Sequence, residues 1–501
     1  MPHVVTQSCC GDASCVYTCP VNCIHPTPDE PDFASAEMLY IDPAACVDCG
    51  ACVAACPVDA IKPHTRLAED EHDFLSINSA FYDVPRPRPL LAPVVPPLEV
   101  RERPRPLRVA VVGSGPAAMY AADEVLTVPG ARVTMVERLP MPYGLARTGV
   151  APDHRRTRGV AAQFDRIREQ DGLDLFLNVE VGKDVTHDDL LAHHHAVVYA
   201  VGASADRPLD VPGAGLPGTA SATEFVAWYN GHPDFADRTF DLSHPRAVVI
   251  GNGNVALDVA RILTVGPAAL AGTDIAPAAL DALRRSRVEE VVVAGRRGPA
   301  QSAFTLPELV GLRSTPGVSV TVPPDDLGPG PADPKLDVLR GLAPGTDAPR
   351  RIRLRYLLSP LRILGRDRAE GVEFGRNALA GDGARAEPTG RTETVDAGLV
   401  LSAIGYRGLP VPGLPFDDAT GTVPNEHGRV VDPRTGRAVP GAFVAGWIKR
   451  GPTGFIGTNK SCALETVRAL VDDYNAGVLA EPGTGRGELA ALLERRPALT
   501  P

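Results

Sequence analysis

The chemically most distinctive residues of this 501-residue chain are its cysteines, nine of which lie between Cys9 and Cys56. A run spaced Cys-x-x-Cys-x-x-Cys-x-x-x-Cys-Pro begins at Cys46, and an equally spaced run begins at Cys9 with aspartate in the second position, so the two form an internal pseudo-repeat. Thiolates at this spacing bind iron–sulfur clusters, and the fourth cysteine of one run ligates the cluster of the other. The sequence therefore predicts two clusters, one held by Cys19, Cys46, Cys49 and Cys52 and the other by Cys9, Cys15, Cys56 and, as a candidate fourth ligand, Asp12.

Residues 1–62 resemble dicluster bacterial ferredoxins along their whole length. Asp12 departs from that family, so the first cluster is expected to be either [3Fe–4S] or [4Fe–4S] with an oxygen ligand, and the second [4Fe–4S]. Cys10 and Cys23 fall outside the ligand pattern and are interpreted as bystanders. Tetrahedral zinc sites use other cysteine spacings, which disfavours a zinc module. The segment holds eight carboxylates and one basic residue, Lys62, so its acidic surface is expected either to be solvated or to steer docking onto a basic surface.

A second pattern is the glycine turn Gly113-x-Gly115-x-x-Ala118, which follows an apolar segment at residues 109–112. A strand, a glycine turn and a helix in this order bind the pyrophosphate of a dinucleotide, because glycine lets the phosphates approach the backbone at the helix N-terminus. The next expected strand, 132–136, ends in Glu137, where a carboxylate meets the ribose 2′-hydroxyl. These features predict a dinucleotide site formed by Gly113, Gly115, Pro116, Ala117, Ala118 and Glu137.

A third pattern, further along the chain, has the same order of expected strand, glycine turn and helix. An apolar segment at 248–250 leads into a second glycine turn, and an expected strand at 290–294 is soon followed by Arg296 and Arg297. A carboxylate at this place favours NAD, whereas arginine suits the 2′-phosphate of NADP, because a planar guanidinium binds phosphate bidentately. The predicted NADP site comprises Gly251, Asn252, Gly253, Asn254, Val255, Arg296 and Arg297.

Two further stretches, 142–154 and 446–459, closely resemble segments of the adrenodoxin-reductase family; the first reads Pro-Tyr-Gly-Leu-Ala-Arg-Thr-Gly-Val-Ala-Pro-Asp-His. The whole chain looks like the fused ferredoxin/ferredoxin–NADP reductases. The resemblance implies FAD at the first glycine turn, with His154 near the flavin in either a structural or a proton-relay role, and it makes His154 and Glu308 the catalytic candidates. It also implies flavin contacts for Leu145, Val181, Trp447, Gly454, Phe455 and Ile456, and contacts with the nicotinamide side of NADP for Glu308 and Gly454.

The patterns predict an α/β protein with two Rossmann-like nucleotide-binding domains, the NADP domain inserted into a split FAD domain, preceded by a small α+β ferredoxin-like domain. The proline-rich stretch before the first glycine turn cannot form a helix and is expected to be an extended spacer. The chain is expected to return to the flavin at 399–405. The expected boundaries are an iron–sulfur domain at 1–62, a Pro-rich linker at 63–106, an FAD domain at 107–205 and 400–501, and an NADP-binding domain at 206–399.

The net charge and the distribution of apolar residues and cysteines argue against several classes of function. The formal charge of −11 argues against a nucleic-acid partner, and no apolar run reaches the roughly 18 residues of a membrane span. The N-terminal residues lack the basic and apolar regions of a signal peptide, so a cytoplasmic protein is expected. A pyridine-nucleotide disulfide reductase would need a redox-active Cys-x-x-Cys near the flavin; none follows Cys56, and Cys462 is interpreted as structural.

The predicted function is that of a ferredoxin–NADP reductase, which transfers electrons between NADPH, FAD and iron–sulfur clusters. The expected acceptor is a ferredoxin or a ferredoxin-dependent protein such as a cytochrome P450. One alternative is an electron-input subunit of a larger oxidoreductase, like the small subunit of glutamate synthase. Another is a redox sensor or scaffold whose nucleotide sites do not turn over.

Overall fold

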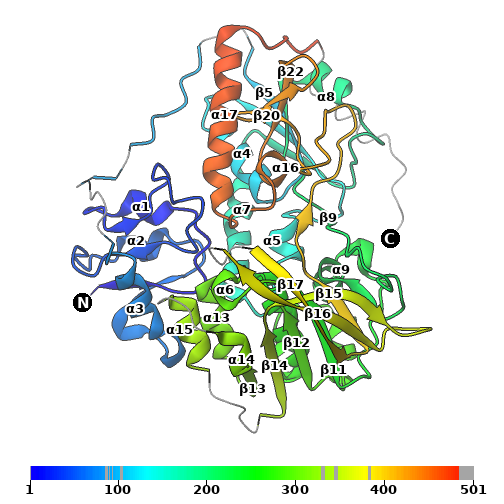
Figure 1. Cartoon of the computed structure of the whole chain (residues 1–501). Coiled ribbons are helices and arrows are strands. Elements are labelled where there is room, and N and C mark those ends of the chain that lie inside the picture. Colours follow the sequence, from blue (N-terminus) through cyan, green and yellow to red (C-terminus); the bar gives the residue numbers. More distant parts are fainter. Residues whose placement is uncertain are drawn as a thin grey trace.

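The computed structural model describes residues 2–84, 89, 91–92, 94–101, 105–328, 333–342, 348–381 and 385–483. Figure 1 shows an N-terminal part in blue, which we call the iron–sulfur module (residues 2–84), beside two larger sheet-based domains. The first Rossmann domain is built on a seven-stranded sheet and the second on a six-stranded sheet. The module contacts both of them.

The two halves of the module follow the same backbone path. Helices α1 (Ser14–Thr18) and α2 (Ala51–Ala55) end at cysteines with nearly identical dihedral angles, φ −75° and ψ 115° at Cys19 and φ −77° and ψ 116° at Cys56. Positive φ angles recur at matched positions of the two halves, namely Gly11 and Asp48, Ala13 and Gly50, and Asn22 and Asp59. The internal repeat expected from the cysteine spacing is therefore present in the backbone.

Short antiparallel pairs of strands hold the module together. Strand β1 (His3–Val5) pairs with β4 (Ile61–Pro63), and β2 (Ile24–His25) pairs with β3 (Tyr40–Ile41). After β4 the chain forms two 3-10 turns and one helix: η1 (His64–Arg66), η2 (Glu69–Glu71) and α3 (Asp73–Ala80).

Asn78 fixes helix α3 to the strands of the module. Its Oδ1 accepts hydrogen bonds from the N–H groups of Val5 (3.2 Å) and Ile41 (3.0 Å), and its Nδ2 donates to the C=O groups of Val5 (2.9 Å) and Phe74 (2.8 Å). The Asn78 side chain is buried, so these four bonds satisfy a polar group away from water. The predicted linker boundary at residue 63 is therefore wrong, because the chain as far as α3 is folded onto the module.

The later part of the predicted linker is extended but not free. It runs beside helix α17 (Thr458–Ala476), where Arg468 donates to the C=O of Pro96 (3.2 Å) and Asn475 donates to the C=O of Glu99 (2.8 Å). Residues 85–88, 90, 93 and 102–104 of this prediction lie outside the described residues. A strip of chain pinned to a helix cannot act as the flexible part of a tether.

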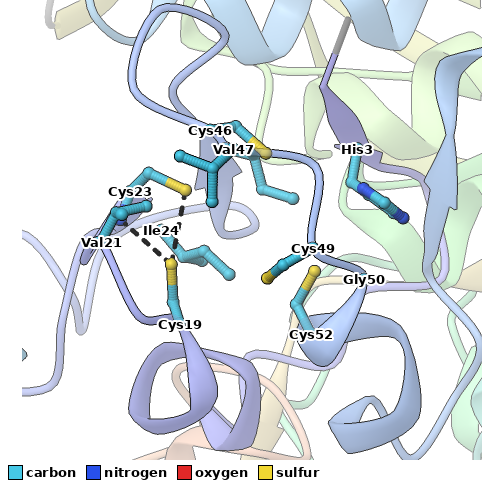
Figure 2. Close-up of a pocket in the computed structure, with 11 residues that line it drawn as sticks. His3, Cys19, Val21, Cys23, Ile24, Cys46, Val47, Cys49, Gly50 and Cys52 are labelled. Carbon is cyan, nitrogen blue, oxygen red and sulfur yellow. Dashed lines mark hydrogen bonds between the residues drawn. The ribbon is translucent and has the colours of Figure 1, made fainter.

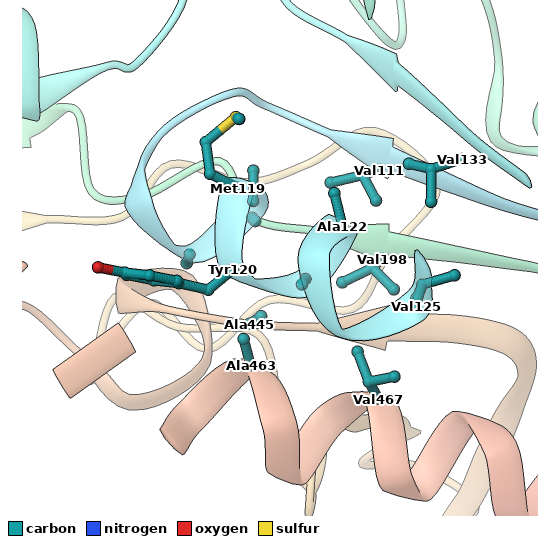
Figure 3. Close-up of a cluster of buried hydrophobic side chains, with 14 of the residues drawn as sticks. Val111, Met119, Tyr120, Ala122, Val125, Val133, Val198, Ala445, Ala463 and Val467 are labelled. Atoms are coloured by element: carbon teal, nitrogen blue, oxygen red, sulfur yellow. The ribbon is translucent and has the colours of Figure 1, made fainter. Parts of the chain in front are cut away.

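The first Rossmann domain has the strand order β20-β21-β22-β8-β5-β6-β7, and β22 to β7 run parallel. Helix α4 (Pro116–Leu126) packs between this sheet and α17, and Figure 3 shows Ala122 of α4 on the side of Val111 and Val133 of the sheet, with Ala463 and Val467 of α17 on the opposite side. Small residues let the two helices approach closely and bury their facing sides. The remaining elements are β5 (Arg108–Val112), β6 (Arg132–Val136), α5 (Leu145–Thr148), α6 (Arg155–Arg158), α7 (Val160–Arg168), β7 (Leu173–Phe176), α8 (His187–His193), β8 (Ala196–Tyr199), β20 (Asn425–Glu426), β21 (Arg429–Asp432), β22 (Arg437–Val444) and α16 (Trp447–Arg450).

The second Rossmann domain is an all-parallel sheet in the order β10-β18-β11-β12-β14-β13. A three-stranded antiparallel sheet, β15-β16-β17, extends it. Its elements are β10 (Thr219–Ser221), α9 (Ala222–Tyr229), η3 (Pro233–Phe235), β11 (Arg246–Ile250), α10 (Asn254–Thr264), α11 (Pro267–Leu270), α12 (Pro277–Arg284), β12 (Glu290–Ala294), η4 (Pro299–Gln301), α13 (Leu306–Arg313), β13 (Val318–Thr321), α14 (Pro324–Leu327), α15 (Pro334–Arg340), β14 (Arg350–Arg355), β15 (Leu358–Leu364), β16 (Gly371–Ala380), β17 (Arg385–Asp396) and β18 (Leu399–Ser402).

The chain crosses between the two Rossmann domains twice at one place. Strands β9 (Ala205–Asp206) and β19 (Tyr406–Arg407) pair antiparallel there. The predicted return to the first domain at residue 399 is too early, because β18 pairs with β10 and β11 inside the second domain. The α/β fold class with one Rossmann domain inserted into the other is confirmed, and none of the helices in the described ranges is long and apolar enough to cross a bilayer.

Replacing Asn78 with alanine should open the module. The substitution leaves two buried N–H and two buried C=O groups without their partner, and we expect a loss of about 3 kcal/mol in local stability. The rates of amide hydrogen exchange at Val5 and Ile41 measure this loss of local stability. The exposed Ser76 on the same helix is the control, and equal exchange in Asn78→Ala and Ser76→Ala would contradict the assignment.

Candidate functional site

The two glycine turns have the same geometry. Gly113 has φ 99° and Gly251 has φ 121°, a region that side chains disfavour. A Cβ atom at Gly113 would lie 2.6 Å from the C=O oxygen of Ala200, and one at Gly251 would lie 2.2 Å from that of Ala403. Both turns therefore require glycine for two independent reasons, the backbone angle and the neighbouring strand end.

The second glycine of each turn leaves open space at a helix N-terminus. Gly115 and Gly253 are the N-cap residues of α4 and α10, and a Cβ at either would meet no atom within 4 Å. No side chain of the described residues caps either helix, so the first N–H groups remain available to an anion. Pro116, Ala117 and Ala118 form the first turn of α4, and Asn254 and Val255 that of α10. This arrangement fits a pyrophosphate in each domain.

Glu137 lies at the end of β6, beside the first turn, and it also builds that turn. Its buried carboxylate accepts hydrogen bonds from the N–H (3.0 Å) and hydroxyl (2.6 Å) of Ser114 and from the N–H of Leu139 (2.9 Å). The residue is therefore fixed where the sequence placed a ribose ligand, and Ser114 is a supporting residue that the sequence did not single out.

Arg296 and Arg297 follow β12 and lie on the surface. Within the described part of the chain neither guanidinium forms an ion pair, whereas their backbone C=O groups are held by Asn377 and Leu357. Gly295 precedes them, and a Cβ there would lie 2.6 Å from Nδ2 of Asn252 in the second glycine turn. The backbone is thus fixed against the turn while both cationic groups stay accessible.

A partly buried cluster of ionisable side chains lies beside this turn. His154 Nε2 is 3.6 Å from Asp258 Oδ1 and 3.9 Å from Glu308 Oε2. Arg261 binds Asp153 through Nε (2.8 Å) and Nη2 (3.0 Å), and its Nη2 lies 2.8 Å from Asp258. The cluster therefore brings together the two catalytic candidates, His154 and Glu308, and it includes a cationic side chain, Arg261.

Burial and neighbouring charges set the protonation of this cluster. Burial raises the pKa of the Glu308 carboxyl and Asp258 raises it further, against the opposing effects of His154 and Arg261. Burial alone would also raise the pKa of Asp153, but the hydrogen bonds and charge of Arg261 hold it below its ordinary value. The pKa of the Glu308 carboxyl is thus shifted toward retaining its proton, and that of Asp153 toward losing it.

The glycine-rich stretch 446–459 contains α16, the loop that joins it to α17, and the first residues of α17. Trp447 donates from Nε1 to the C=O of Thr453 (3.0 Å), and Thr458 Oγ1 accepts from the N–H of Phe455 (2.9 Å). Gly446 lies against α4, where a Cβ would be 2.5 Å from Cβ of Ala117. The loop that contains Gly454, Phe455 and Ile456 therefore adjoins the first glycine turn. Leu145 begins α5, and Val181 lies in a bridge with Val185.

The structure gathers the cysteines into two groups. Figure 2 shows Cys19, Cys46, Cys49 and Cys52 around one cavity, which is the predicted second ligand set. Cys23 also lines it, with its Sγ 3.4 Å from that of Cys19, and its hydrogen bond lowers the pKa of the Cys19 thiol to about 5. The thiol excluded by spacing is therefore a neighbour of the ligand set.

The second group is Cys9, Cys15 and Cys56 with Asp12. Burial raises the pKa of the Cys9 thiol to about 12, with Cys56 and Asp12 contributing in the same direction. Burial likewise raises the pKa of Cys15, with Cys9, Asp12 and Cys56 adding to it. Asp12 itself accepts hydrogen bonds from the N–H and hydroxyl of Ser14.

The loop of this second group is docked directly on the glycine-rich loop of the first Rossmann domain. The N–H of Gly457 donates to the C=O of Cys10 (2.7 Å), and Lys460 Nζ donates to Ser14 Oγ (3.1 Å). A Cβ at Gly457 would lie 2.1 Å from the backbone N of Asp12. Cys10 is buried within the core of the first Rossmann domain. The thiol interpreted as a bystander is therefore a docking residue.

Comparison with known proteins identifies the family. Residues 107–274 match the family model described as pyridine nucleotide-disulphide oxidoreductase, and residues 39–62 match the 4Fe-4S binding domain. The chain is 58% identical over 520 residues to the probable ferredoxin/ferredoxin–NADP reductase of Mycobacterium tuberculosis, covering 99% of this chain and 88% of that protein. The chain belongs to the ferredoxin/ferredoxin–NADP reductase family. A probable ferredoxin/ferredoxin–NADP reductase of Mycobacterium leprae is 56% identical over 513 residues, covering 99% and 90% of the two chains.

A solved relative supports the reductase part. The structure of Mycobacterium tuberculosis FprA in complex with NADPH has a TM-score of 0.73 and 44% identity, covering 78% of this chain and 90% of that one. The prediction of an NADPH-dependent ferredoxin–NADP reductase is confirmed at this level. No Cys-x-x-Cys, the redox-active motif of a disulfide reductase, follows Cys56 in this chain. The match to the disulphide-oxidoreductase model therefore reflects the shared nucleotide-binding fold.

From the sequence, no role was assigned to several residues that belong to or contact the charge cluster around Glu308. Asp153 and Asp258 lie within the quoted motifs but carried no expected role, and the spacing of Asp258 and Arg261 on one helix was an available signal for an ion pair. Gln7 donates to Glu308 at 3.0 Å, and no local pattern points to that contact.

Gly457→Ala should undock the module loop without unfolding the reductase. Gly457 has φ −74° and ψ −27°, which alanine adopts freely, and the atoms nearest to a Cβ there belong to the backbone of Gly11 and Asp12. We expect faster amide exchange at 9–15 and 455–459 with an unchanged melting temperature of the Rossmann domains. The control is Gly266→Ala, at a glycine with open space and negative φ. The docking assignment fails if the two variants exchange alike.

Proposed function

We propose that NADPH binds the second Rossmann domain, with its pyrophosphate at the N-terminus of α10 and its 2′-phosphate on Arg296 and Arg297. The supporting observation is the fixed backbone of these arginines beside an open glycine turn, with guanidinium groups that form no ion pair among the described residues. Residues Gly251, Asn252, Gly253, Asn254 and Val255 form the cradle. Glu308 and Gly454 face the nicotinamide side, and His154 and Glu308 are the residues that act there.

FAD is proposed to bind the first Rossmann domain. Its pyrophosphate would take the place left open at Gly115, and Glu137 would meet a ribose hydroxyl. Of the flavin contacts, the loop with Phe455 and Ile456 is supported by its position next to α4. The full proposed set is Gly113, Gly115, Pro116, Ala117, Ala118, Glu137, Leu145, Val181, Trp447, Gly454, Phe455 and Ile456.

The two cysteine groups are proposed to hold the iron–sulfur clusters. Cys19, Cys46, Cys49 and Cys52 supply four thiolates for a [4Fe–4S] cluster. Cys9, Cys15 and Cys56 supply three, and both carboxylate oxygens of Asp12 are engaged by Ser14, which favours a [3Fe–4S] cluster. Bound FAD would supply the change between hydride and one-electron chemistry, and the clusters would supply one-electron carriers.

Among external acceptors, we propose a ferredoxin-dependent one-electron acceptor such as a cytochrome P450, in addition to ferredoxin. The second half of the module supports this, because Val47 is 58% exposed and Cys49 is exposed, whereas the loop from Cys9 to Cys15 is docked on the reductase. NADPH-driven reduction of purified ferredoxins and cytochromes by the full chain tests the proposal. Failure of NADPH to bleach the flavin under anaerobic conditions would favour the sensor alternative.

Replacing both Arg296 and Arg297 with alanine should change the nucleotide preference. Each hydrogen bond to a charged phosphate contributes roughly 1.5–3 kcal/mol, so KM for NADPH should rise at least tenfold while KM for NADH stays nearly constant. Steady-state kinetics with both nucleotides measures this. The control removes an exposed basic pair elsewhere, Arg284→Ala with Arg285→Ala. Equal effects on NADPH and NADH would refute the assignment.

Asp12→Cys should convert the first cluster. A fourth thiolate completes the ligand set, so we expect a four-iron cluster that survives mild oxidation, whereas the wild type and Asp12→Asn should show three-iron signals. Electron paramagnetic resonance and iron content before and after oxidation provide the measurement. Identical spectra and identical lability in the wild type, Asp12→Cys and Asp12→Asn would contradict the prediction.

A further inference from the structure

Helix α13, which carries Glu308, is held by the iron–sulfur module along its length. At its start, the N–H of Leu306 donates to Glu37 Oε2 of the module at 2.7 Å. In its middle, Val310 is fully buried in the hydrophobic core of the module, and near its end Arg313 pairs with Asp73. Figure 1 shows α13 and α15 beside the blue helix α3. A helix of the second Rossmann domain is thus positioned by the module.

One contact reaches the carboxylate of Glu308 itself. Gln7 of the module donates from Nε2 to Glu308 Oε2 at 3.0 Å. The amide fits because residue 311, the next on α13 after Val310, is glycine: a Cβ there would lie 2.3 Å from Gln7 Nε2 and 2.4 Å from Oε1. Glycine disfavours a helix interior, so its presence is explained by the space that the Gln7 side chain needs.

The other groups that face Glu308 act by charge rather than by a directed bond. His154 Nε2 is 3.9 Å away, beyond hydrogen-bond range, and Asp258 and Arg261 face the carboxylate from α10. A carboxylate surrounded only by charges keeps rotational freedom, whereas a hydrogen bond at 3.0 Å fixes one oxygen. Gln7 therefore provides the directional restraint on this side chain.

We infer that Gln7 is a positioning residue for Glu308, so that the iron–sulfur module completes the nicotinamide side of the NADPH site. The inference rests on the proposed placement of NADPH. It gives the module a second task besides holding the cysteines. The amide of Gln7 does not touch the reacting atoms; it holds the carboxylate that does.

Two substitutions in the full-length, flavin-loaded protein test the inference. Gln7→Leu removes the donor, and Gly311→Ala displaces the unchanged Gln7 while improving helix propensity. Both should lower the rate of flavin reduction by NADPH and the affinity for NADP⁺ by about tenfold, the size expected for one hydrogen bond to a charged group. The double variant should lose little more than either single one, since both break the same contact.

The probes and control separate positioning from loosening of the interface. Affinity for 2′,5′-ADP, which carries the 2′-phosphate but no nicotinamide, should stay at the wild-type value in both variants. Arg313→Ala removes an exposed ion pair of the same helix with the module and should leave NADP⁺ affinity unchanged. A loss in Arg313→Ala equal to that in Gln7→Leu, or unchanged NADP⁺ affinity in both Gln7→Leu and Gly311→Ala, overturns the inference. Absence of NADPH-driven flavin reduction in the wild type would instead refute the proposed function.

Discussion

The contact between the module and the reductase depends on a missing side chain at Gly457. Two backbones meet there at a distance that no Cβ atom allows, and the N–H of Gly457 donates directly to the C=O of Cys10. A backbone contact cannot be adjusted by rotamers, so it defines the position of the module more sharply than a layer of side chains would. Ion pairs around it, such as Glu37 with Lys335 and Glu71 with Arg156, add attraction between the acidic module and basic residues of both Rossmann domains.

The partly buried charge cluster depends on the contacts between the same parts of the chain. Asp153 belongs to the first Rossmann domain, Asp258 and Arg261 to the second, and Gln7 to the module. Removing one charge from this partly buried set leaves the buried Arg261 and its neighbours incompletely compensated. The cluster is therefore complete only when all three parts of the chain are in place. The reductase and its module form a single unit, unlike two independent domains on a flexible tether.

Short-range patterns predicted most of the fold and part of the site. Gly113, Gly251 and the cysteine runs are constrained by local geometry, so their spacing in the sequence is informative. The predicted linker boundary at residue 63 is wrong because the proline pattern carries no information about the stretch before it. In that stretch Asn78 hydrogen-bonds to strands more than thirty residues away. Contacts such as Gln7 with Glu308 join residues about three hundred positions apart and depend on how domains dock, which no local pattern encodes.

The repeated backbone of the module has a consequence for how partners can change. Its two halves share one path, yet the Cys9–Cys15 loop is enclosed by the reductase whereas Val47 and Cys49 lie at the surface. A substitution in the enclosed half is constrained by the glycine-rich loop of the first Rossmann domain, whereas Val47 of the outer half lies at the surface. The two halves of one internal repeat therefore have different surroundings, the first docked on the reductase and the second with a side chain open to partners. Substitution of the exposed Val47, which is not among the proposed cluster ligands, can change the surface that an acceptor meets while the inner junction stays as it is.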